Sequence, residues 1–464
     1  MAQTKGAVVK WKEAKVIKTV DGECSIHPSI HPSKEMERME IYKKTDEESL
    51  LGLFKHPTIT NQIGAVERFS SEWLHKFTSG HGVSLLDTTW NLKKEFSKIN
   101  LSWVPDPKED YKDCDKSNDL LPEPRWSETL RCIKFPSLEE LEIFLQVIEI
   151  ILGENLQNHY YNTVGSFLKF YEDYKKQGRP PLKEFFLNYQ ARILSESLSC
   201  VGLSYALIEY IVNSDLSLLY PQLKSCLFLA SCEECITEVD NYCSFSPPNK
   251  SVAVKEHVLA VCKIYVEGRE GVIILDPGYH VGIPIVVMED GLYPHKGWFV
   301  QSETPKSKKE YCYQLKGDYV HWTVRETRNG KEKTWCNLIY IKKKFLSYVS
   351  VSEKRNLVFN FRTLVARDEK QPIGGFYCNM EGDEKFTLFF KDYLGKRVEI
   401  KIPFGYFKGS RNNNEYESAI RKCAIQIKSN TALLVGMMTQ LVEAYYDKEF
   451  MIPVNEINRE IDED

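Results

Sequence analysis

The chain has 464 residues, of which 42% are hydrophobic, 12% aromatic and 27% charged, and its formal net charge is −4. This length predicts two or three domains, and the aromatic content excludes a chain that is mostly disordered. The slightly acidic balance and the lack of a long basic stripe argue against a nucleic-acid-binding protein.

The sequence contains no candidate membrane span. Its longest nearly uncharged stretch, Tyr210–Lys224, is shorter than the ~20 apolar residues that a bilayer requires, and the N-terminus lacks the apolar segment of a secretory signal. We therefore expect no membrane association and a cytoplasmic location. The 13 cysteines are then expected to be reduced thiols, at least one of which is a candidate for chemical use.

Residues 1–125 are expected to form an N-terminal accessory region, because they contain no catalytic pattern. Short helices are expected at 65–76 and 88–99, where apolar residues recur near helical spacing, and a polar loop at 105–124. This extension is a candidate docking region for a protein partner.

Helical periodicity dominates from Ser137 onwards. The run from Ser137 to Glu140 is typical of a capping box and predicts a helix that continues to Gly153. Three more helices are expected at 158–175, 181–192 and 197–212. The last of them is apolar and rich in small residues, as a buried helix would be.

The pattern changes to the alternation of strands after residue 248, where a hairpin is expected from strands at 257–266 and 272–276. Further strands are expected at 310–315, 319–326, 334–341, 357–366, 375–380, 385–390 and 397–402, before a helix at 415–446 and an acidic tail. This order predicts an α+β fold. We expect an accessory region at 1–125, a helical and stranded thiol-catalytic core at 126–310, and an antiparallel β domain with the C-terminal helix at 311–464.

Three residues form the pattern of nucleophilic thiol catalysis, which needs a thiolate, a histidine that accepts and returns a proton, and a group that orients the histidine. Cys200 lies near the start of a predicted buried helix, where the helix dipole favours a thiolate. His257 opens the first strand of the hairpin and Asp276 closes the second. Gly202 would allow the close approach of a substrate.

The hairpin register tests whether His257 and Asp276 can meet. If Glu267 and Gly268 form a two-residue turn, Asp276 lies opposite Leu259 and diagonal to His257. Diagonal neighbours are ~7–8 Å apart, which an Asp–His hydrogen bond can bridge when the strand ends converge. A four-residue turn would keep both residues on the same face but add an offset, so the register permits this contact without deciding it. Each residue alone also has a structural interpretation: a small buried hydrophobe, a polar strand end and a turn residue.

This order of residues resembles the papain-like thiol superfamily that includes transglutaminases and arylamine N-acetyltransferases. In both families a cysteine at a helix start precedes a strand histidine and an aspartate on the next strand. The Cys–His spacing and the run Leu275-Asp-Pro-Gly278 are more similar to the transglutaminase core. Gly278-Tyr279, Pro284 and the run Leu292-Tyr-Pro294 are more similar to the acetyltransferases, as are the aromatic residues of the later strands. The similarity covers roughly residues 185–400.

The resemblance implies a helical half with a buried Cys-bearing helix packed on an antiparallel sheet or barrel. It also implies Cys200 as nucleophile, His257 as general base and acid, and Asp276 as the residue that orients the imidazole. The acetyltransferase pattern Arg-Gly-Gly-x-Cys-Phe-Glu-x-Asn is absent, and Val201 stands where transglutaminases commonly have Trp.

The expected function is therefore thiol-dependent acyl transfer through an acyl-cysteine, with acetyl-CoA or another acyl-CoA as candidate donor and a small molecule or a protein as acceptor. One alternative is a transglutaminase-like, hydrolase or peptidase activity on protein substrates. The other is a catalytically inactive interaction protein on the same fold.

Other residues give weaker signals. Tyr279 and His280 follow Asp276 and are candidate substrate contacts, although isolated loop residues of these types are usually solvated or packed. Four cysteines at close spacing are weak zinc candidates, or else reduced core thiols: Cys226, Cys232, Cys235 and Cys243. Glu233 and Glu234, inside that run, are expected in an exposed turn.

Overall fold

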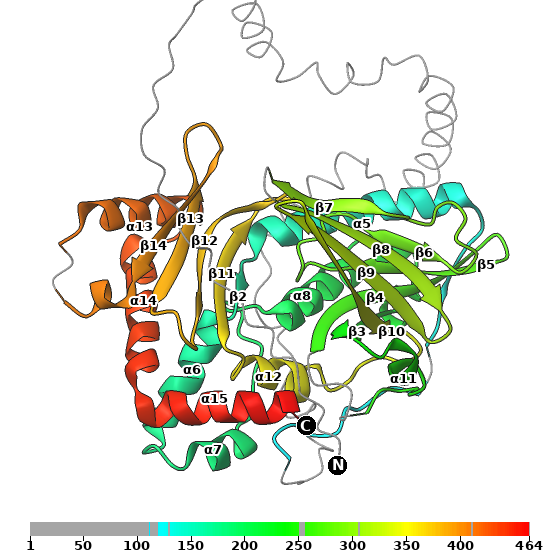
Figure 1. The fold of residues 1–464 in the computed structure, drawn as a ribbon. Coiled ribbons are helices and arrows are strands. Elements are labelled where there is room, and N and C mark those ends of the chain that lie inside the picture. Colours follow the sequence, from blue (N-terminus) through cyan, green and yellow to red (C-terminus); the bar gives the residue numbers. More distant parts are fainter. Residues whose placement is uncertain are drawn as a thin grey trace, which may run out of the picture. The chain divides into compact units, whose positions relative to one another are not determined.

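The computed structural model describes residues 111, 119–128, 130–249, 256–304, 307–409 and 412–463 (Figure 1). The chain divides into two units, Met1–Leu85 and Leu86–Asp464, and every described residue belongs to the second. The helices expected at 65–76 and 88–99 lie outside the described residues. Among the residues described, no helix is long and apolar enough to cross a membrane.

The larger β structure is a nine-stranded, mainly antiparallel sheet that curls into a half-barrel (Figure 1). Its path is β6-β5-β4-β3-β10-β9-β8-β7, and β1 pairs in parallel with β4 beside this path. The strands are β1 (Ile133–Phe135), β3 (Leu227–Ile236), β4 (Glu256–Val266), β5 (Arg269–Leu275), β6 (Ile285–Met288), β7 (Phe299–Thr304), β8 (Ser307–Lys316), β9 (Tyr319–Arg328) and β10 (Lys331–Tyr340). The sheet runs across the boundary expected at residue 310, because β8 contains it.

A second sheet of five antiparallel strands has the order β14-β13-β12-β11-β2. Its strands are β2 (Tyr161–Asn162), β11 (Phe361–Arg367), β12 (Pro372–Asn379), β13 (Lys385–Lys391) and β14 (Arg397–Pro403). Thus an early, short strand, β2, pairs with β11 from much later in the chain.

The helices are α5 (Leu138–Asn158), α6 (Val164–Lys176), α7 (Leu182–Asn188), α8 (Cys200–Val212), α9 (Leu216–Leu219), α10 (Leu223–Cys226), α11 (Val239–Cys243), α12 (Lys354–Asn356), α13 (Asn414–Gln426), α14 (Thr431–Tyr446) and α15 (Lys448–Glu463). A π-helix, η3 (Tyr348–Glu353), leads into α12, and a 3-10 turn, η4 (Phe404–Phe407), follows β14. The predicted cap at Ser137 is confirmed, because its hydroxyl accepts from the Glu140 N–H at the start of α5, whereas the Glu140 carboxylate accepts from the Tyr220 hydroxyl.

Helix α8 lies between the two sheets in Figure 1 and packs on β4, where the Ser204 hydroxyl donates to the Val258 carbonyl at 3.2 Å. Its apolar residues enter two cores. Val201 and Leu203 join the core built by α6, β11–β13 and the C-terminal helices, and Leu207 joins the core shared with α5. The interior of the half-barrel forms a third core around Trp322.

The α+β organisation expected from the sequence is confirmed, and several boundaries differ. The strand expected to begin at residue 357 begins at Phe361, because α12 and the following turn occupy the preceding residues. The single helix expected at 415–446 is two helices, α13 and α14, since the Asn430 side chain caps a new helix start. The expected acidic tail forms α15, whose buried apolar residues pack into the core.

Candidate active site

Cys200 is the first residue of α8. The helix starts there because Ser199 has an extended backbone and its hydroxyl accepts a hydrogen bond from the Val201 N–H at 3.1 Å, as an N-cap does. The Ser199 hydroxyl in turn donates to the buried carboxylate of Glu353 at 2.5 Å. Cys200 is only 5% exposed and lies in the first turn of the helix.

The β4–β5 hairpin places His257 and Asp276 together. Glu267 and Gly268 form a two-residue turn with φ values of 50° and 83°, which matches the twist of the flanking strands. Ala260 pairs with Leu275, so the next register position sets Asp276 opposite Leu259, and this predicted register is confirmed. The strand ends converge, and His257 Nε2 lies 3.0 Å from Asp276 Oδ2.

Gly278 lies at the centre of the three residues. A Cβ atom at this position would stand 2.9 Å from Cys200 Cβ, 2.7 Å from His257 Cε1 and 3.3 Å from Asp276 Oδ1. The three candidates from α8, β4 and the end of β5 therefore surround one glycine. The Nε2 atom of His257 is hydrogen-bonded to Asp276. The Nδ1 atom is therefore the ring nitrogen that can bond to the Cys200 thiol.

The surroundings of His257 favour its imidazolium form. Burial by itself disfavours that charge, but the charge of Asp276 and hydrogen bonds to Asp276 and Cys200 outweigh it and hold the pKa of His257 well above its usual range. A protonated imidazole beside a thiol stabilises the thiolate.

Tyr279 supports the site from the half-barrel side. Its N–H donates to Asp276 Oδ1 at 2.9 Å, and its ring meets the His257 ring edge-on at 4.7 Å between centroids. Its hydroxyl donates to Glu234 Oε1 at 2.6 Å. Burial raises the pKa of the Glu234 carboxyl, against the opposing effects of the His257 charge and the Tyr279 hydrogen bond.

Glu234 was placed wrongly by the sequence analysis, which expected an exposed turn. It belongs to β3, paired to β4 and β10, and Glu233 beside it is 2% exposed. The apolar run Leu227-Phe-Leu-Ala230 directly before this segment is the signal that could have indicated a strand.

Arg367 is a second residue that the sequence did not point to. It is 3% exposed, and Nη1 donates to the carbonyl oxygen of Pro277, the residue between Asp276 and Gly278. Burial lowers the pKa of Arg367 to about 10, which leaves it protonated at neutral pH. Arg367 therefore holds the loop that carries Asp276 and Gly278.

A cavity of about 530 Å³ opens beside the thiol and is lined by Cys200, His257, Gly278 and Tyr279. Residues of β2, β11, α12 and α15 also line it, among them Tyr161, Arg355, Phe361, Arg362 and Asp462. Cavities of ~300–1,000 Å³ are typical of small-molecule sites.

Two of the expected substrate contacts lie elsewhere. Gly202 packs against Leu198 and Ile193, so that a Cβ atom at position 202 would stand only 2.8 Å from Leu198 Cδ2, and it does not line the cavity. His280 Nε2 donates to the Asp368 carbonyl at 2.7 Å, and burial together with the Arg367 charge lowers its pKa to about 4. Tyr279 alone of the three lines the cavity beside Cys200.

The four cysteines considered for zinc are spread over α10, β3 and α11. Within the described ranges, no group of three or more His, Cys, Asp or Glu side chains is placed to hold a metal ion. Cys226 and Cys232 are buried, Cys235 is exposed, and Cys243 Sγ lies 3.7 Å from His321 Nε2.

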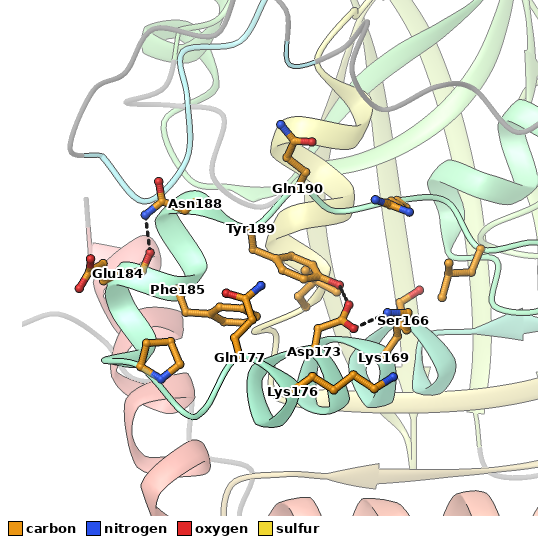
Figure 2. A pocket seen from close by; sticks show the side chains of 14 residues that line it. Ser166, Lys169, Asp173, Lys176, Gln177, Glu184, Phe185, Asn188, Tyr189 and Gln190 are labelled. Atoms are coloured by element: carbon orange, nitrogen blue, oxygen red, sulfur yellow. Dashed lines mark hydrogen bonds and ion pairs between the residues drawn. The ribbon is translucent and has the colours of Figure 1, made fainter.

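A different hollow, of about 610 Å³, lies between α6 and α7 (Figure 2). Three of its polar side chains bond to one another: Lys169 pairs with Asp173, which also accepts from the Tyr189 hydroxyl at 3.0 Å. Of the described residues that line it, none is a cysteine or a histidine, so it offers no nucleophile beside a base.

The cavity beside Cys200 thus combines a thiol at a helix start, a histidine favoured as a cation and a carboxylate that orients it. This set can form and break a bond between sulfur and an acyl carbon. Comparisons of the chain with protein-family models, with curated proteins and with solved structures find no match.

Proposed function

We propose that the chain is a cysteine-dependent acyltransferase-like enzyme that works through an acyl-Cys200 intermediate, on a papain-like fold. The observation that carries this proposal is the placement of Cys200, His257 and Asp276 around Gly278 at the wall of one cavity. The distant resemblance to arylamine N-acetyltransferases and transglutaminases supports it.

In the first half-reaction, the Cys200 thiolate attacks the acyl carbonyl, and a C–S bond forms. The bond to the leaving group then breaks as the His257 imidazolium gives that group a proton. Backbone N–H groups at the start of α8 are the candidate donors to the oxyanion between these events. Asp276 keeps the imidazole oriented and stabilises its charge.

In the second half-reaction, the neutral imidazole accepts a proton from the acceptor, which attacks the acyl carbon and releases the Cys200 thiolate. An amine acceptor gives acyl transfer, whereas water gives hydrolysis and a glutamine donor with an amine gives transglutamination. Acetyl-CoA and other acyl-CoA molecules are the first donors to try.

A catalytically inactive interaction protein on the same fold is the second candidate. Its supporting observation is that Cys200 is only 5% exposed, while the sequence around it departs from the acetyltransferase pattern. In that case the N-terminal region 1–125 would be the part to test for a protein partner.

The experiment that separates the two candidates measures alkylation by iodoacetamide at each cysteine, as a function of pH, by mass spectrometry. Cys132 is exposed and does not line the cavity, so it serves as the internal reference thiol. We expect Cys200 to react faster than Cys132 below pH 7, and the reaction to slow in a His257→Ala variant.

A His295→Ala variant is the matched control, because His295 does not line the cavity. If Cys200 reacts more slowly than the exposed Cys132 at every pH, the enzymatic proposal is wrong and the inactive candidate gains support. If Cys200 is reactive, incubation with acetyl-CoA should add one acetyl group to the Cys200 peptide and to no other.

A further inference from the structure

The lining of the cavity includes buried positive charge from α12 and β11. Arg362 is 1% exposed, and its Nη1 and Nη2 atoms donate to the carbonyls of Asn356 and Leu357 at 2.6 and 2.7 Å. In the part of the chain that the structure describes, no carboxylate pairs with it. Burial lowers the pKa of Arg362 to about 9, so the guanidinium remains charged at neutral pH.

Arg355 is the second guanidinium in the lining of the cavity, and it has a carboxylate partner. It is 5% exposed, Nη1 donates to Asn458 Oδ1 at 2.8 Å and Nη2 to Asp462 Oδ1 at 2.7 Å. Asp462 comes from the last turn of α15, lines the cavity and keeps 36% of its side chain exposed. The carboxylate that pairs with Arg355 is therefore open to solvent, although Arg355 itself is buried.

Two carboxylates line the cavity: Glu234, which accepts from the Tyr279 hydroxyl, and Asp462, which pairs with Arg355. The charge of the buried Glu233, which does not line the cavity, also acts on Arg355 and opposes the effect of burial on its pKa. Arg362 is thus the guanidinium of the lining that has no carboxylate partner among the described residues, and a positive charge in a concave site raises the local concentration of anions.

We propose, resting on the function proposed above, that the small molecule that reacts at Cys200 carries an anionic group, a carboxylate or a phosphate, which binds Arg355 in place of Asp462. Exchange of one oxyanion for another leaves no buried charge unpaired, and a guanidinium suits both groups through bidentate hydrogen bonds. The aromatic rings of Tyr161 and Phe361 also line this cavity and offer apolar contacts to the rest of such a molecule.

The test compares two alkylating reagents of similar size, anionic iodoacetate and neutral iodoacetamide. Both form a C–S bond at the thiolate and release iodide, so the ratio of their rates at Cys200 reports how the cavity receives an anion. Asp462→Asn should raise the iodoacetate rate roughly 3- to 10-fold, because the anion no longer competes with a carboxylate. The iodoacetamide rate should stay within about 2-fold, because the thiol itself is unchanged.

Glu460→Gln is the matched control. It removes the same charge from the same helix, but Glu460 pairs with Lys183 and does not line the cavity. A double variant, Arg355→Gln with Asp462→Asn, removes both members of the ion pair and should abolish the gain in iodoacetate rate.

The inference is overturned if Asp462→Asn and Glu460→Gln change the rate ratio equally. It is also overturned if neither succinate nor inorganic phosphate protects Cys200 from iodoacetamide. Protection by succinate supports a carboxylate substrate, and protection by phosphate supports a phosphorylated one. Failure of the proposed function looks different, because Cys200 would then be slow toward iodoacetamide itself.

Discussion

Gly278 lies against His257 so closely that a methyl group at position 278 would stand 2.7 Å from the His257 Cε1 atom. The same methyl group would be 2.9 Å from the Cβ atom of Cys200. Carbon atoms in contact are ~3.5–4.0 Å apart, so either the imidazole or the thiol side chain would have to move. The absence of a side chain at position 278 therefore sets the spacing between thiol and base.

A Gly278→Ala variant should separate Cys200 from His257. We expect the alkylation rate of Cys200 at pH 7 to fall at least about 10-fold, and the protein to lose about 1–3 kcal/mol of stability through overpacking. Gly297→Ala is the control, because a Cβ there meets no atom within 4 Å. Equal labelling of Cys200 in both variants would show that the close contact has no bearing on thiol reactivity.

Asp276 should control the reactivity of the thiol through His257. Its charge is the largest influence that raises the pKa of His257 against the effect of burial, so an Asp276→Asn variant should lower that pKa and disfavour the imidazolium. A thiolate at Cys200 would then lack this counter-charge, and we expect the alkylation rate of Cys200 at pH 7 to fall about 10-fold.

Asp290→Asn is the control for this charge change, since Asp290 pairs with Arg269 on the exposed side of the neighbouring turn. Its alkylation rate at Cys200 should equal that of the unmodified protein. An unchanged rate in Asp276→Asn would mean that Asp276 does not act on the thiol through His257.

The sequence could predict the hairpin because local rules determine it. Glu267-Gly268 suits a two-residue turn, and alternation of side chains then fixes which residues of β4 and β5 share a face. His257 and Asp276 follow from that register alone. The helix start at Cys200 is similarly local, since Ser199 provides the N-cap.

The rest of the candidate site depends on long-range packing, which local patterns do not encode. Arg355 and Arg362 reach the cavity because β11 pairs with β2, and Asp462 reaches it because α15 folds back over the core. The acidic composition of 448–463 suggested a solvated tail, but its apolar residues recur at helical spacing and are buried. Glu234 was missed because two adjacent glutamates suggest a turn more strongly than a strand.

Glu353 should make stability depend on pH. It is 1% exposed beneath the start of α8, and burial raises its pKa to about 7 against the opposing hydrogen bonds of Ser199 and Ser166. Between pH 4.5 and 7 the unfolded chain has lost this proton while the folded protein retains it, so stability falls as the pH rises. The loss is on the order of 3 kcal/mol by pH 8.

A Glu353→Gln variant lacks this titration. Its free energy of unfolding, minus that of the unmodified protein, should therefore grow by about 3 kcal/mol between pH 5 and pH 8 in urea titrations. His159 and His280, whose pKa values burial lowers to about 4, raise stability over the same range in both proteins and cancel in the difference. Glu172→Gln, at an exposed position, should give a flat difference, and a flat difference for Glu353→Gln would contradict the prediction.

The hydrogen bond between Tyr279 and Glu234 should be measurable as a coupling energy. Tyr279→Phe removes the hydroxyl donor and leaves the partly buried Glu234 carboxylate without this hydrogen bond. We expect this to lower the free energy of unfolding by about 1–3 kcal/mol. Glu234→Gln keeps an acceptor for the hydroxyl, whereas Glu234→Leu removes both the charge and the acceptor. Unfolding free energies of Tyr279→Phe, Glu234→Leu and their combination should give a coupling of about 1.5–3 kcal/mol, as for a hydrogen bond to a charged group.

The same cycle also tests whether this pair positions His257. The Tyr279 ring contacts the imidazole edge-on, so a ring released from Glu234 should let the imidazole shift away from Cys200. We expect Glu234→Leu to slow alkylation of Cys200 at pH 7, and Glu234→Gln to restore most of the rate because the hydroxyl keeps its partner. If both Glu234 variants label Cys200 at the unmodified rate, the bond stabilises β3 against the following loop without any part in holding the base.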